Sequence, residues 1–105
     1  MSDVLSDLYA TLQARKGADP ASSYVAKLYG DGLDRILKKV GEEASETIIA
    51  AKGSDRAALV HELADLWFHS LVLMAQKDIA LSELTDELSR RKGRSGLEEK
   101  AARSK

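Results

Sequence analysis

Five carboxylates stand inside the two most apolar stretches of this chain, and they limit what it can fold into. Residues 41–46 read GEEASE, and residues 61–65 read HELAD. The stretch that holds the second motif, from Ala57 to Ala75, is otherwise almost continuously hydrophobic. An acid in such surroundings loses hydration and must gain a proton, a basic partner or a metal ion. The fold must supply one of these to Glu42, Glu43, Glu46, Glu62 and Asp65.

The two stretches are predicted to form a helical hairpin. Apolar residues recur at helical spacing over residues 33–52, and Gly53 ends the pattern. Ser54 or Asp55 can cap a second helix over residues 56–76. Because only about three residues join the helices, they should pack antiparallel. The second helix is apolar on every side, which is typical of a helix at the centre of a fold.

Helical geometry brings the acids of both motifs to matching heights in this hairpin. Glu46 lies about six residues before the turn, and Glu62 lies about seven residues after it. Glu43 and Asp65 are each about nine or ten residues from the turn. At about 1.5 Å of rise per residue, each pair differs in height by about one residue. The sequence therefore predicts that the E-x-x-E edge of one helix faces the E-x-x-D edge of the other.

The rest of the chain is also predicted to be helical, so the fold class is all-α. Further helical segments are expected at about residues 3–17, 24–29 and 82–92, and no strand-like alternation separates them. We expect one helical-bundle domain over residues 1–92, followed by a polar tail, residues 93–105, that is mobile unless a partner orders it. The expected helix caps are Ser2 or Asp3, Ser22 or Ser23, and Ser82.

A divalent cation is the simplest partner for four or five converging carboxylates. Lys38 and Lys39 are the only bases near the motifs, too few to neutralise the acids. Ligand sets made only of oxygen select hard ions such as Mg²⁺ or Mn²⁺. Magnesium usually shares its coordination sphere with substrate phosphates. The motifs therefore predict phosphate chemistry.

These residues also admit other interpretations. The first motif alone would suit a solvated helix face with Lys38–Glu42 and Lys39–Glu43 pairs. A di-iron bundle needs Glu-x-x-His on two helices, and neither histidine stands three residues after a glutamate. His69 is interpreted as a core histidine or a partner of the metal ligand Asp65. His61 falls outside the acidic sector and is interpreted as incidental.

Composition excludes several other classes of protein. Sixteen basic and seventeen acidic residues nearly cancel over 105 residues, so no overall field points to nucleic acid or membrane. The absence of cysteine removes disulfides, thiolate metal sites and cysteine nucleophiles. No uninterrupted apolar run reaches the ~18–20 residues of a membrane span, and the first residues lack the pattern of a signal peptide. We expect a soluble cytoplasmic protein.

The paired acidic motifs resemble those of the MazG-like all-α nucleoside triphosphate pyrophosphohydrolases. Within that superfamily, the chain is similar to the phosphoribosyl-ATP pyrophosphatases of histidine biosynthesis. The likeness lies in SSYVAKLYGDGLDRILKKVGEEASETIIAAK (22–52), HELADLWFHSLVLMAQKDIAL (61–81) and the ending RRKGRSGLEEKAAR. The run Trp67-Phe68-His69 departs conservatively from the hydrophobic-Tyr-His that the family usually shows there.

The resemblance implies Mg²⁺-dependent hydrolysis of phosphoribosyl-ATP to phosphoribosyl-AMP and pyrophosphate by a homodimer. It makes Glu43, Glu46, Glu62 and Asp65 the expected metal ligands. Glu42 is expected to be an extra ligand or the group that orients the attacking water.

Basic and aromatic side chains are expected to meet the substrate. The Arg90-Arg91-Lys92 run could add cationic contacts, and Lys39 is the strongest candidate because it falls between Glu42 and Glu43. The expected substrate-binding residues are Tyr24, Lys27, Lys38 and Lys39.

Two alternatives remain open. One is a house-cleaning or deoxynucleoside triphosphate pyrophosphohydrolase with the same metal site. The other is a non-catalytic helical dimerisation module whose acids only form salt bridges.

Overall fold

The computed structural model describes residues 3–93 and 96–103, and every regular element in these ranges is a helix. This confirms the predicted all-α class. In chain order the helices are α1 (Asp3–Ala14), α2 (Tyr24–Asp31), α3 (Leu33–Lys52), α4 (Arg56–Gln76), α5 (Leu81–Arg90) and α6 (Gly96–Arg103).

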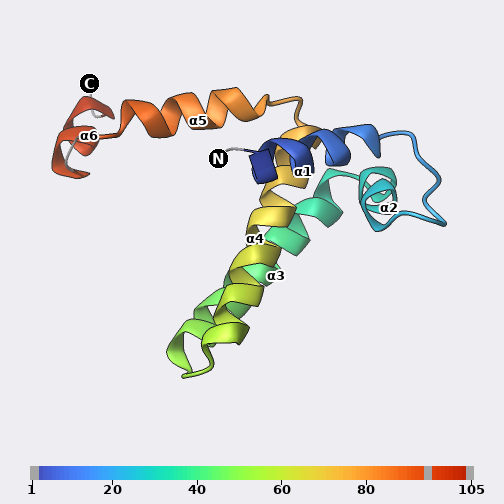
Figure 1. The fold of residues 1–105 in the computed structure, drawn as a ribbon, viewed down its shortest axis with the longest axis horizontal. Coiled ribbons are helices and arrows are strands. Elements are labelled where there is room, and N and C mark those ends of the chain that lie inside the picture. Colours follow the sequence, from blue (N-terminus) through green and yellow to red (C-terminus); the bar gives the residue numbers. More distant parts are fainter. Residues whose placement is uncertain (1–2, 94–95, 104–105) are drawn as a thin grey trace.

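Helices α3 and α4 form the predicted antiparallel hairpin, which projects from the rest of the molecule as a long stalk (Figure 1). The bounds of both helices match the sequence prediction. Of the two predicted caps, Asp55 is the one used, and its carboxylate accepts a hydrogen bond from the Ala58 backbone N–H at 3.1 Å. This bond satisfies one of the donors that every helix N-terminus leaves open. The sharp turn sets the register of the two acidic motifs.

The hydrophobic core lies at the base of the stalk, where α1 and α2 pack against the hairpin. Leu12, Leu28, Ile36 and Val72 are the largest fully buried side chains, one from each of the first four helices. The Tyr29 hydroxyl donates to the Leu12 carbonyl at 2.8 Å, which ties α2 to α1. The core thus holds the base of the hairpin rigidly.

The outer part of the hairpin keeps an apolar surface exposed. Trp67 on α4 is 57% exposed, and Val60 and Ile49 are also exposed. By length and composition alone, α4 could cross a membrane, a test that the core helix of a globular protein also passes. In this fold α4 packs against α3 and carries Glu62 and Asp65.

The two ends of the chain differ from the prediction. Helix α1 ends at Ala14 rather than near Gly17, because Gly17 adopts a left-handed φ of 83° in the following turn. Helix α5 begins at Leu81, so Ser82 is not its cap. Instead, the Glu83 carboxylate accepts a hydrogen bond from the Ala80 N–H at 2.9 Å. Helix α6 occupies part of the expected polar tail, and the predicted cap Ser2 lies outside the described residues.

Candidate metal and substrate site

Three of the predicted metal ligands converge between α3 and α4. Oxygen atoms of Glu43, Glu46 and Glu62 all lie within 4.8 Å of one another. Glu43 is buried, with only 5% of its surface exposed. The predicted register is therefore confirmed for these three acids, because the E-x-x-E edge of α3 meets Glu62 of α4.

Two oxygens in this cluster are short of partners. Glu43 Oε1 and Glu62 Oε1 are buried and accept no hydrogen bond within the described part of the chain. Burial, reinforced by the neighbouring Glu46 carboxylate, raises the pKa of Glu62. Unpartnered buried carboxylate oxygens are costly, and a hard cation is the ligand that oxygen donors of this kind hold best. The residues present therefore fit a divalent metal.

Asp65 belongs to a second, overlapping group. Its carboxylate lies with His61 and Glu62, and His61 Nε2 is 3.3 Å from Asp65 Oδ2. Glu62 is common to both groups. His61, interpreted from the sequence as incidental, is exposed and lies one helical turn from Asp65, so that the two side chains meet.

Lys39 bridges the acids of the first motif. Its ammonium lies 3.4 Å from Glu42 Oε1 and 3.6 Å from Glu43 Oε2. Burial alone would lower the pKa of Lys39, but Tyr24, Glu42 and Glu43 outweigh that effect and raise it. Lys39 is therefore a protonated cation at neutral pH, at the rim of the cluster. The alternative pair, Lys38–Glu42, is replaced by the Lys39–Glu42 contact.

Tyr24 and His69 tie α2 to α4 beside the cluster. His69 Nδ1 lies 2.8 Å from the Asp65 backbone carbonyl, which can only accept, so Nδ1 carries the hydrogen. With its hydrogen on Nδ1, the ring can accept at Nε2 from the Tyr24 hydroxyl, which lies 2.8 Å away. Burial raises the pKa of Tyr24, which keeps this donor protonated. His69 is thus a buried, hydrogen-bonded histidine, and its contact with Asp65 is to the backbone carbonyl of that residue.

The other predicted basic residues are not gathered at the cluster. Lys27 pairs with Asp31 at 3.4 Å on α2, and Lys38 is exposed on α3. Arg90 and Arg91 both bind Glu87 on α5, at 2.6 and 2.9 Å, and these contacts lower the pKa of Glu87 to about 2. Helix α5 extends away from the hairpin (Figure 1), so in one chain these bases are remote from the acids.

The chain matches the model of one protein family over residues 5–92, described as phosphoribosyl-ATP pyrophosphohydrolase. It is also similar over nearly its whole length to curated proteins named phosphoribosyl-ATP pyrophosphatase. The relative from Nitrosomonas eutropha is 52% identical over 98% of this chain and 88% of its own length. Those from Nitrosospira multiformis and Neisseria gonorrhoeae are each 54% identical over 96% of this chain, and over 84% and 94% of their own lengths.

The matched range contains the hairpin, both acidic motifs and the residues that meet around them. The resemblance found in the sequence motifs is thereby confirmed over nearly the whole chain. The chain belongs to the phosphoribosyl-ATP pyrophosphohydrolase family.

Proposed function

We propose that this protein hydrolyses phosphoribosyl-ATP to phosphoribosyl-AMP and pyrophosphate, the second step of histidine biosynthesis. Membership of the family supports the reaction and its substrate. The observation that carries the proposal is the cluster of Glu43, Glu46 and Glu62, two of which have a buried oxygen without a partner. Such a cluster destabilises an isolated chain and has a clear use in binding a metal with a phosphate substrate.

The metal in this proposal is Mg²⁺, with Mn²⁺ as a substitute. Glu43, Glu46 and Glu62 would hold it, and Asp65 would complete the ligand set from the neighbouring group that shares Glu62. When bound, such an ion offsets the charge of phosphate oxygens and lowers the pKa of a coordinated water.

The chain's own side chains then position the phosphates and the attacking water. Lys39 already contacts Glu42 and Glu43, so its ammonium lies beside the proposed metal ligands, where it can also bind a phosphate oxygen. Glu42 is half-exposed at the rim, where it can orient a water molecule and accept its proton. Phosphoryl transfer needs such positioning and charge stabilisation more than covalent chemistry.

We further propose that two copies form a cytoplasmic homodimer through the apolar surface of α4. A groove of about 410 Å³ runs beside exposed Val60, Leu63 and Trp67. A second groove of similar volume lies between α4 and α5 and includes Leu84 and Leu88. Helix α5 extends away from the hairpin (Figure 1) and carries leucines, so it can cover the apolar groove of a second copy. In a two-fold symmetric dimer, α5 of the second copy covers the groove of the first.

One assay tests the proposed reaction. Purified protein with Mg²⁺ and phosphoribosyl-ATP should release one pyrophosphate per phosphoribosyl-AMP formed. Glu62→Gln should release none, whereas Asp86→Asn, an exposed acid on α5, should match wild type. Preferred turnover of dUTP or dCTP would instead assign the chain to the deoxynucleotide enzymes of the superfamily. No turnover of any nucleotide would favour the non-catalytic module.

A further inference from the structure

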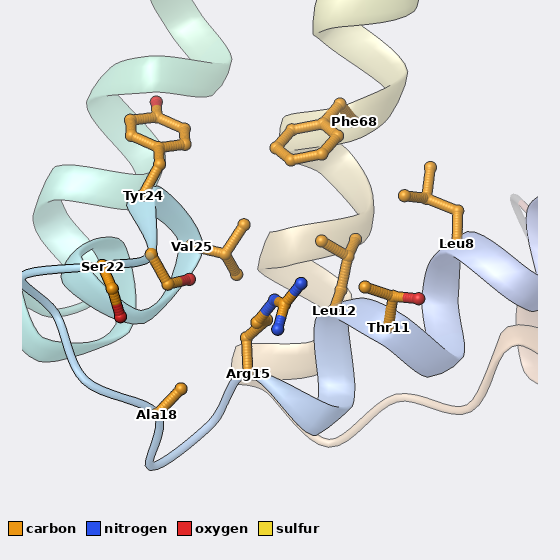
Figure 2. A pocket seen from close by; sticks show the side chains of 10 residues that line it. Leu8, Thr11, Leu12, Arg15, Ala18, Ser22, Tyr24, Val25 and Phe68 are labelled. Atoms are coloured by element: carbon orange, nitrogen blue, oxygen red, sulfur yellow. The ribbon is translucent and has the colours of Figure 1, made fainter.

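A cavity of about 420 Å³ lies between α1, α2 and α4 (Figure 2). Its volume falls in the range of sites for small organic ligands, roughly 300–1,000 Å³. Phe68 and the ring of Tyr24 supply aromatic surface on its walls, and aliphatic side chains complete them. No motif in the sequence indicated this space, because its lining comes from three helices and a loop.

The cavity has one cationic group. Figure 2 shows the Arg15 guanidinium directed from the end of α1 into the space between α1 and α2. Within the described residues, no carboxylate forms a salt bridge with Arg15. Ser22 and Ser23 also line the cavity, where the Ser22 hydroxyl donates to the Asp19 carbonyl and the Ser23 hydroxyl accepts from the Ala26 N–H. An exposed arginine without a carboxylate partner is a common donor to a bound phosphate.

Tyr24 joins this cavity to the acidic cluster. Its ring lines the cavity, while its hydroxyl donates to His69, whose own ring binds the backbone of the cluster residue Asp65. Phe68 stands six residues after Glu62 on α4, about 9 Å of helix rise. A nucleotide with its phosphates at the cluster would pass the Tyr24–His69 pair to reach the cavity.

We infer that this cavity binds the phosphoribosyl-adenine portion of the substrate, and that Arg15 holds the phosphate at its far end. The inference rests on the proposed function. Phosphoribosyl-ATP differs from ATP by a second ribose, attached to the base, that carries its own 5′-phosphate. The substrate thus has phosphate at both ends, and the fold offers a cation at both ends, Lys39 at the cluster and Arg15 in the cavity. Arg15 is the residue that distinguishes phosphoribosyl nucleotides from ordinary adenine nucleotides.

Binding of two nucleotides to Arg15→Gln tests this assignment. Calorimetric titration should show that the wild type binds phosphoribosyl-AMP more tightly than AMP. Arg15→Gln should weaken phosphoribosyl-AMP binding by roughly 10-fold or more, the usual effect of losing a charged hydrogen bond, and leave AMP binding within about 2-fold. Arg15→Lys should restore part of the difference. Arg56→Gln, which removes an exposed arginine at the start of α4, should change neither affinity.

Steady-state kinetics provide a second readout. Because Arg15 lies away from the reacting phosphorus, Arg15→Gln should raise KM for phosphoribosyl-ATP by roughly 10-fold and leave kcat unchanged. An unchanged KM, or equal weakening of AMP and phosphoribosyl-AMP, would overturn the subsite while wild-type turnover still supports the proposed function. Failure of the wild type to release pyrophosphate would overturn the proposed function itself.

Discussion

Helix α4 has two faces that the isolated chain leaves unsatisfied in opposite ways. One face carries Glu62, whose Oε1 is buried without a partner against the acids of α3. The other carries Val60 and Trp67, apolar side chains that are more than half exposed. The acidic face holds buried carboxylates that no positive charge fully neutralises, whereas the apolar face exposes hydrophobic surface to solvent.

The two faces therefore need different partners. A carboxylate cluster is satisfied by one small ion, because charge is compensated at short range. An apolar face needs area, which another protein surface supplies. Stability that depends on the acidic face should follow the metal concentration, and stability that depends on the apolar face should follow the protein concentration. The five predictions below test that separation.

The largest effect is expected from removing a ligand charge. Glu46→Gln should reduce kcat/KM for phosphoribosyl-ATP by roughly 1,000-fold or more, because metal and phosphate stabilisation is worth several kcal/mol in the transition state. Helical content by circular dichroism should not change, since the substitution conserves volume. Sedimentation should still find a dimer, because Glu46 is not on the apolar face. Turnover close to that of the wild type would remove Glu46 from the ligand set.

The second-largest effect is expected from Lys39→Met. The ammonium is only 3.4–3.6 Å from two carboxylates, but helix pairs spaced three or four residues apart contribute only a few tenths of a kcal/mol to stability. The melting temperature should therefore stay within a few degrees of wild type. Turnover should fall roughly 100-fold, because charge stabilisation in a sheltered site is worth more in the transition state. Lys38→Met, a neighbouring exposed lysine, is the matched control and should retain activity.

The hairpin and its register could be predicted from sequence because both depend on local rules. Gly53 ends one helix, Asp55 caps the next, and the intervening turn fixes the heights of Glu46 and Glu62. The start of α5 could not be predicted in the same way. Ser82 is the better cap by residue type. However, the Glu83 carboxylate accepts a hydrogen bond from the Ala80 N–H, and this bond places the start of the helix one residue before Ser82.

The candidate site was predictable where it lies on the hairpin and not where it depends on packing between distant segments. The acids share one helical face by spacing alone, so periodicity locates them. The Tyr24–His69 hydrogen bond joins residues 45 positions apart, and no local pattern encodes that contact. The same holds for Arg15, which faces the cavity only because α1 packs across α4.

Trp67→Glu should weaken dimerisation through the apolar face of α4 and leave the carboxylates of the acidic face unchanged. A buried tryptophan at an interface typically contributes about 2 kcal/mol or more, so the dimer dissociation constant should rise roughly 30-fold or more. Analytical ultracentrifugation measures the change. Gln13→Glu, at an exposed position of α1 that lines neither groove, introduces the same charge and should leave the dimer unchanged. An unaltered dissociation constant in Trp67→Glu would place the dimer interface elsewhere.

Mg²⁺ should stabilise the fold through the acidic face. At about ten times its dissociation constant, a bound ion adds about 1.4 kcal/mol, which corresponds to roughly 6–10 °C in melting temperature for a domain of this size. EDTA should reverse the rise. The Trp67→Glu protein should show the same shift, because its acidic face is unchanged. A melting temperature that changes with neither Mg²⁺ nor EDTA would argue against a metal at Glu43, Glu46 and Glu62.

The smallest effect is the pH dependence of the metal-free protein. Burial and the neighbouring Glu46 raise the pKa of Glu62 above its usual value of 4.5, so ionised Glu62 opposes folding near neutral pH. The native state then binds more protons than the unfolded chain between 4.5 and the raised pKa. Stability must rise as pH falls through that window.

In EDTA, the melting temperature of the wild type should therefore gain relative to Glu62→Gln as the pH is lowered from 7 toward 5. Saturating Mg²⁺ should reverse the sign, because the ion binds only ionised carboxylates and protons compete with it. Trp67→Ala should keep the wild-type response in both conditions, since this substitution neither adds nor removes a titratable group. If the melting temperatures of the wild type and Glu62→Gln change in parallel with pH in EDTA, the neighbours of Glu62 do not destabilise its ionised form. The acidic face of α4 would then not be electrostatically unfavourable in the metal-free protein.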